Sequence, residues 1–342
     1  MSALNIFGRR CLRTARNALP LLLIGFSLLA GASRLAAAAS DPPQIWMAAT
    51  EPDRRAVMGW GANDYLQLFE PGAPWQQVAR HVQVFQFAEE FILRASPETL
   101  SHVIAFLNQH GIAIAMQGAP NLPTRGCGRG IESYGAPHDM LREAERIQKL
   151  GGVVSYITMD EPLNFGHVFN GRFGKIPCHS PIATIAADAA TKIAEARRVF
   201  PSVQVGETEP YGIPNVSSEG WASMLAEWFR DFQQATGRPL AYEHVDIVWN
   251  RPTALSQLEA ALPVIRQAGI PLGIIYNGTA RDPDSAAWVA EAKSHIALME
   301  GRLGLRPQHV IFQSWTALPR MMLPETSPDT LTGLIASYIA TH

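Results

Sequence analysis

The chain has 342 residues, of which 47% are hydrophobic and 17% are charged. Residues 1–39 hold five of the 28 Lys and Arg residues and none of the 30 acids, so residues 40–342 carry 23 basic and 30 acidic side chains, a formal charge of −7. This charge argues against nucleic acid or an anionic lipid surface as the partner. About 300 residues with nearly half of them apolar suffice for one large core.

The N-terminal segment predicts export. Four arginines lie between residues 9 and 16, an apolar run occupies 19–32, and "RLAAAAS" offers small residues for cleavage near Ala39. This order is typical of a secretory signal peptide. The alternative is an uncleaved membrane anchor, but the run is shorter than the roughly 20 residues of a spanning helix, and Arg34 prevents its extension into the alanines. We expect a signal peptide at 1–39, a mature domain at 40–342, a secreted or periplasmic location without membrane insertion, and a monomer.

Eight strand-like runs then alternate with helix-like segments. Between the strands, apolar residues recur at helical spacing, as at Leu100, Val103, Ile104 and Leu107. This alternation predicts βαβ units and a parallel sheet, and eight units in one domain predict a single (β/α)8 TIM barrel. The predicted strands are 56–64, 82–91, 112–120, 153–162, 203–210, 244–250, 271–278 and 309–315.

Helix boundaries also have signals. Ser-Pro pairs at 96–97, 180–181 and 327–328 are expected to open helices, because Ser can cap free amides and Pro at the first helical position loses no hydrogen bond. Gly111 and Gly269 are expected to end helices, since glycine tolerates the left-handed cap.

The cysteines indicate one disulfide. Cys11 would leave with the signal peptide, and Cys127 and Cys178 remain as an even pair in a chain bound for an oxidising compartment. The alternative is two buried thiols. If the bond forms, it ties the long segment after the fourth strand, with His167, to the segment after the third, across the active face.

Acidic residues gather where the predicted strands end, which is the active face of such a barrel. Asp160 and Glu161 end the fourth strand, and Glu207 and Glu209 end the fifth. Cleavage of a glycosidic bond needs one carboxylic acid and one carboxylate, while amides and aromatic rings can bind sugar. The remaining candidates for substrate binding are Glu89, Glu90, Trp60, Asn63, Gln117, His167, Tyr211, Trp249, Asn250, Tyr276, Asn277, Gln313 and Trp315.

The chain resembles the (βα)8-barrel glycoside hydrolases. In the cellulase-like clan, Asn-Glu-Pro ends the fourth strand and a Glu ends the seventh; "DEP" at 160–162 matches two of the three positions, but the seventh strand ends without an acid. The alpha-amylase-like and related clans place an Asp nucleophile on the fourth strand and the acid/base on a neighbouring strand, often the fifth. That layout implies Asp160 with Glu209 or Glu207.

Side-chain alternation directs Asp160 into the barrel mouth. Glu207 and Glu209 share a face, and Glu209 is nearer the strand end. We therefore predict that Asp160, Glu161 and Glu209 are catalytic, with Glu207 as the alternative to Glu209. Structural roles, such as binding loops and helix ends, are the alternative for each of these acids.

Two functions remain open. The first is an exported glycoside hydrolase acting on a poly- or oligosaccharide without a cofactor. The second is an inactive barrel that binds carbohydrate or assists envelope polysaccharide assembly. A metal hydrolase is less favoured, because the sequence contains no HExxH or comparable ligand motif.

Overall fold

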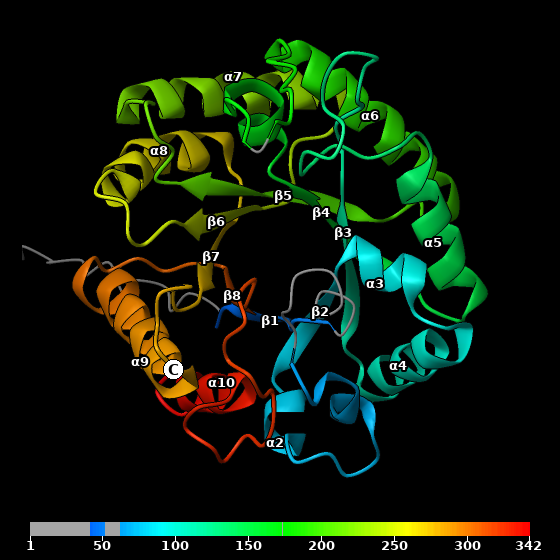
Figure 1. Ribbon diagram of the computed structural model, residues 1–342, viewed down its shortest axis with the longest axis vertical. Helices are drawn as coiled ribbons and strands as arrows, with labels where there is room; N and C mark the ends of the chain where they lie inside the picture. The colour runs from blue at the N-terminus through cyan, green and yellow to red at the C-terminus, as the bar shows by residue number, and fades with distance from the viewer. Residues whose placement is uncertain (1–41, 52–61, 173) are drawn as a thin grey trace, which may run out of the picture. The chain divides into compact units, whose positions relative to one another are not determined.

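The computed structural model describes residues 42–51, 62–172 and 174–342. Eight parallel strands form a closed barrel in the order β1 to β8, with β8 paired to β1 from Gln44↔His309 to Ala48↔Gln313. Figure 1 shows the helices arranged around this barrel. The strands are β1 (Gln44–Ala48), β2 (Val82–Phe87), β3 (Ala113–Gly118), β4 (Val154–Asp160), β5 (Gln204–Tyr211), β6 (Glu243–Ile247), β7 (Leu272–Tyr276) and β8 (His309–Gln313).

The single (β/α)8 barrel predicted from the sequence is confirmed, and seven predicted strands overlap β2 to β8, although the predicted range 82–91 runs on into α3. The prediction of the first strand was wrong. Gln44–Ala48 occupies that place, whereas the predicted range 56–64 lies mostly outside the described residues and ends in the turn before η1. The helical elements are η1 (Tyr65–Phe69), α2 (Gln76–Ala79), α3 (Glu89–Arg94), α4 (Pro97–His110), α5 (Asp139–Lys149), η2 (Asn164–Val168), α6 (Ile182–Val199), α7 (Ser218–Thr236), α8 (Ala254–Ala268), α9 (Ser285–Ile296), η3 (Ala297–Arg302) and α10 (Leu331–Ile339).

The helix signals were right in part. The Ser96 hydroxyl accepts from the Thr99 amide at 3.1 Å at the start of α4, and Gly111 and Gly269 have φ values of 67° and 68° where α4 and α8 end. The other two Ser-Pro pairs do not cap helices. Pro181 itself precedes α6, and Thr330 caps α10.

Each strand has one face towards the barrel interior and one towards the helices. A buried cluster fills the interior with Trp46, Val84, Ala115, Tyr242, Ile275 and Ile311. Beside this cluster, His244 Nε2 lies 3.0 Å from His309 Nδ1. A much larger cluster packs the outer faces of the strands against the helices. This alternation decides where each acid of β4, β5 and β6 points.

The predicted signal peptide lies outside the described residues, and it stays a prediction. Among the helices of the described part of the chain, none combines the length and the apolar character needed to cross a membrane.

Candidate active site

The inner faces of β4 and β6 bring two aspartates to the C-terminal end of the barrel. The Thr158 hydroxyl of β4 donates to Gln86 Oε1 at 2.7 Å and lies 2.9 Å from the Tyr242 hydroxyl, at the start of β6, which fixes these residues inside the barrel. Asp160 lies two positions after Thr158, and Asp246 lies four positions after Tyr242. Both aspartates therefore project from the same inner faces as these two residues. The two aspartates therefore approach each other above the Thr158 and Tyr242 layer.

Asp246 has a pKa suited to proton transfer. Burial raises the pKa of this carboxyl, the charge of Asp160 raises it further, and donors on Asn277 and Trp315 lower it, with a net value of about 7. One side-chain oxygen of Asp246 is buried without a hydrogen-bond partner among the described residues. Asp246 thus holds a proton up to neutral pH while retaining capacity to bind a ligand.

Sequence reasoning missed Asp246. From the predicted strand 244–250, only the last two residues, Trp249 and Asn250, are named as candidates. The residues of its inner face are not among them. Tyr242, the residue before β6, alternates with His244 and Asp246 on the strand, and this period of two was the signal that could have identified the aspartate.

Glu161 follows Asp160 in a left-handed backbone conformation, with φ 47°. Its carboxylate accepts from Asn164 Nδ2 at 2.7 Å, which couples it to the π-helical turn η2. Burial, followed by the charges of Glu132 and Asp160, raises the pKa of Glu161 well above its ordinary value. An L-residue with positive φ is uncommon, so the turn at Glu161 is held by its surroundings.

Trp249 forms an aromatic surface beside Asp246. Its indole nitrogen donates to Asn277 Oδ1 at 2.8 Å, and its ring stacks on His295 with centroids 3.6 Å apart and planes 5° apart. His295 Nδ1 is in turn 2.8 Å from the Asn277 carbonyl oxygen. Since His295 covers one face of the indole, only the opposite face could meet a sugar ring.

Glu207 and Glu209 do not face Asp160 across the mouth, contrary to the sequence-based prediction. The inner face of β5 consists of Gly206, Thr208 and Pro210. The inward-facing Tyr242 ring shows this, because it would lie 2.4 Å from a Cβ atom at Gly206. Glu207 and Glu209 therefore point towards the helices, where both are 0% exposed.

Both outer glutamates have structural partners. Glu209 accepts from the backbone N–H groups of Leu163 and Asn164 at 2.6 and 3.1 Å, so it holds the turn that follows β4. Glu207 accepts from the Trp228 indole of α7 at 2.6 and 2.7 Å and pairs in register with Glu243. Burial raises the pKa of Glu207, Glu209 and Glu243 well above the ordinary value.

The other predicted ligands divide into three groups. Two tyrosines are buried on outer faces, where Tyr211 donates to Glu243 and Tyr276 donates to Glu300, so they do not line the mouth. A second group lies away from the mouth or is not described: Glu90, Asn63 and Asn250 are exposed, and Trp60 lies outside the described residues. Glu89 is half-buried, and burial raises its pKa to about 7. The residues that reach the mouth from inner strand positions, or stand at its rim, are Gln117, Gln313, Trp315, Asn277 and Trp249.

The predicted disulfide is present. Cys127 and Cys178 are joined with their Cα atoms 5.0 Å apart, and the Gly128 amide donates to the Ile176 carbonyl at 2.9 Å beside the bond. His167 lies in the same segment, with Nδ1 2.8 Å from the Ser180 carbonyl oxygen. The segments after β3 and β4 therefore form one connected wall next to Glu161.

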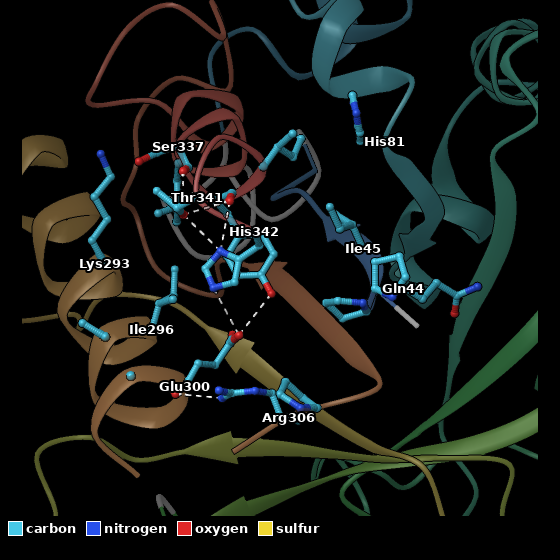
Figure 2. Close-up of a pocket in the computed structure, with 18 of the residues that line it drawn as sticks. Gln44, Ile45, His81, Lys293, Ile296, Glu300, Arg306, Ser337, Thr341 and His342 are labelled. Carbon is cyan, nitrogen blue, oxygen red and sulfur yellow. Dashed lines mark hydrogen bonds and ion pairs between the residues drawn. The ribbon is translucent and has the colours of Figure 1, made fainter. Parts of the chain in front are cut away.

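The opposite end of the barrel differs in chemistry. A cleft of about 1280 Å³ lies there, beside the starts of β1 and β8. Figure 2 shows Glu300 within it. The Glu300 carboxylate forms an ion pair with His342, and Arg306 donates a hydrogen bond to the Glu300 backbone carbonyl. Because this carboxylate is occupied by its own chain, and because barrel enzymes carry out catalysis at the other end, we place the site at the Asp160 end. Within the described residues, no group of three or more His, Cys, Asp or Glu side chains is arranged to hold a metal ion.

Comparisons with known proteins find likeness in the fold. No protein-family model matches the sequence, and no curated protein matches it. Among solved structures, a psychrophilic glycoside hydrolase family 10 endo-β-1,4-xylanase superposes with a TM-score of 0.52 at 10% identity, covering 86% of this chain and 96% of the other. An endo-1,4-β-xylanase from Caldicellulosiruptor owensensis gives 0.50 at 9%, covering 86% and 96%. Xylanase 10C from Cellvibrio japonicus, solved with xylopentaose, gives 0.50 at 12%, covering 87% and 67%. At such low identity these similarities establish the barrel fold alone.

Proposed function

We propose that the protein is an exported glycoside hydrolase that cleaves a poly- or oligosaccharide with Asp160 and Asp246 as its working carboxyls. The observation that carries this proposal is the pair itself. Both aspartates share the inner face at the C-terminal end of the barrel, close enough that the charge of Asp160 adds to burial in raising the pKa of Asp246 to about 7. Like charges at close range leave one carboxyl protonated and one ionised, which is what acid/base catalysis requires.

In this mechanism Asp246 is the general acid. Its proton passes to the glycosidic oxygen as the bond from that oxygen to the anomeric carbon breaks. The Asp160 carboxylate acts on the anomeric carbon, either by direct attack or by taking a proton from an attacking water. A separation of about 5–5.5 Å between working carboxyls accompanies the first route, with retention, and roughly 6.5–9.5 Å the second, with inversion.

The surroundings of the pair support a sugar ligand. One oxygen of Asp246 has no hydrogen-bond partner among the described residues and can accept from a hydroxyl. Trp249, held by Asn277 and His295, offers a flat apolar surface. Glycosidase sites combine such surfaces with carboxylates and amides.

Two features support export. Residues 1–39 have the order of a signal peptide, and the Cys127–Cys178 bond is of a kind that persists in oxidising compartments. N-terminal sequencing of the protein recovered from outside the cytoplasm should begin near Ser40. Recovery with residue 1 intact would contradict cleavage.

The activity test is release of reducing ends from a panel of bacterial, plant and fungal polysaccharides. The parent should release reducing ends from at least one polymer, and an Asp160→Asn variant prepared in parallel should not. Proton NMR of the first-formed anomer then separates retention from inversion. If the parent binds a polymer at equilibrium but releases no ends from any of them, the inactive carbohydrate-binding barrel is the correct function instead.

A further inference from the structure

We propose that the wall formed by residues 119–138, 161–172 and 174–181 binds anionic groups, so that the substrate is an acidic polysaccharide bearing carboxylate or sulfate. This inference rests on the proposed hydrolase function and adds the substrate class. We call these residues the loop pair.

The loop pair concentrates positive charge. It carries four exposed cations, none of which has an ion-pair partner among the described residues: Arg125, Arg129, Arg172 and Lys175. Its acids are Glu132 and Glu161, so its formal charge is +2, and the other residues of 40–342 must carry −9 to give the total of −7. A cationic surface on an otherwise negative protein attracts an anionic ligand to one place.

The cations are held on a firm framework rather than on independent loops. The disulfide joins Cys127 to Cys178, and the Gly128 amide donates across the pair to Ile176 at 2.9 Å. Lys175 lies against Gly130, where a Cβ atom would be 3.9 Å from Lys175 Cε. Arg129 and Lys175 therefore belong to one surface, although they are 46 positions apart in the sequence.

This surface adjoins the proposed active site. Asn121 Nδ2 donates to the Pro162 carbonyl at 3.1 Å, so the base of one loop is fixed to the residue after Glu161. Glu132, three positions after Arg129, is close enough for its charge to raise the pKa of Glu161. A polymer lying across Asp160 and Asp246 would extend over the loop pair on this side.

The features of the wall favour an acidic polysaccharide over other polyanions. Ile176 is 63% exposed, and the Phe165 and Phe169 rings, both half-buried, lie 5.2 Å apart in the same segment, which gives apolar contact area beside the charges. The rest of residues 40–342 carries −9, which disfavours the extended anionic surface of a duplex nucleic acid or of a membrane. A sugar polymer can present its charge to the wall and a glycosidic bond to the carboxyls.

Binding measurements can test this inference separately from catalysis. Affinities are measured in an Asp160→Asn background, so that cleavage does not interfere, for polygalacturonate, dextran sulfate and neutral dextran, and also for duplex DNA and phosphatidylserine vesicles. The test variant replaces the four cations of the loop pair by glutamine. The matched control replaces four exposed cations elsewhere, namely Lys149, Arg238, Arg266 and Arg302.

We expect one of the two acidic polymers to bind at least about tenfold more tightly than neutral dextran, with affinity falling as salt rises. Tighter binding of polygalacturonate or of dextran sulfate identifies carboxylate or sulfate as the recognised group. The test variant should lose on the order of tenfold in affinity, and the control about twofold or less. No preference for an acidic polymer, full affinity in the test variant, or equally tight binding of DNA or vesicles overturns the inference. Selective binding without hydrolysis by the parent overturns only the hydrolase.

Discussion

Strands β4 to β6 carry two sets of acids that differ first in the face of the strand from which they project. Asp160 and Asp246 project inwards and meet at the open end of the barrel. Glu207, Glu209 and Glu243 project outwards and are fully buried against the helices and the turn after β4. Burial raises the pKa of Asp246 and of all three outer glutamates.

A raised pKa alone therefore does not identify a catalytic acid. Glu207 and Glu209 accept hydrogen bonds from Trp228, Leu163 and Asn164, so their environment is complete without a ligand. Asp246 instead projects into the barrel mouth and stands beside a second inward acid; an unpartnered oxygen does not distinguish it, because Glu243 of the outer set has one too. Access to a ligand, decided by strand parity, separates a functional carboxyl from a structural one.

The largest expected effect comes from removing the inner acid. Asp246→Asn keeps the shape of the side chain and removes the proton donor, so kcat on a cleaved substrate should fall on the order of 10²–10⁴-fold. The matched change on the outer face, Glu243→Gln, should leave kcat within about twofold. Steady-state kinetics on both variants, with circular dichroism to confirm folding, make the measurement. A large loss in Glu243→Gln with no loss in Asp246→Asn would reverse the roles of the two faces.

Removal of an outer-face glutamate is expected to lower the stability of the fold. Glu209→Ala leaves the Leu163 and Asn164 amides without their acceptor, and each unsatisfied buried donor costs about 1–3 kcal/mol, so the free energy of unfolding should fall by about 2–4 kcal/mol. Glu209→Gln retains one acceptor oxygen and should cost less. Urea titration of the two variants measures the difference. Parent-like stability in Glu209→Ala would show that Glu209 does not hold the turn after β4.

The pH dependence of activity should follow the inner acid alone. In the proposed mechanism Asp246 works as the protonated acid, and its pKa is about 7, so kcat/KM should fall about tenfold per pH unit above pH 7. The same descending limb should be present in Glu207→Gln, whose carboxyl does not face the mouth. An activity that stays constant from pH 7 to 9 would exclude Asp246 as the proton donor.

The smallest effect should come from Trp315→Phe. The indole donor lowers the pKa of Asp246, and a neutral hydrogen bond contributes about 1 kcal/mol. Its removal should therefore move the descending limb of the kcat/KM–pH profile to higher pH by about 0.5–1 pH unit. The limb should move in the same direction in Asn277→Leu. A downward shift in Trp315→Phe would show that the indole does not stabilise the ionised carboxyl.

The sequence was sufficient for the barrel because its strands and helices have strong local patterns. It was insufficient for β1, since Gln44–Ala48 is short and close to the predicted signal peptide. Parity along "VSYITMD" directed Asp160 inwards, as β4 places it, but β5 is buried on both faces, so polarity did not distinguish Glu209 from Thr208. The face of β5 became clear only from the contact between Gly206 and Tyr242 on the next strand, a relation between positions 36 apart.

The bond between Cys127 and Cys178 has a consequence for resistance to proteolysis. It joins residues separated by 51 positions and encloses α5 and β4 in one covalent ring. Several exposed residues of the kind that trypsin-like proteases recognise lie inside that ring, among them Arg129 and Arg172. A single cut at either one opens the ring but cannot divide the chain, so the nicked protein remains one molecule until the disulfide is reduced.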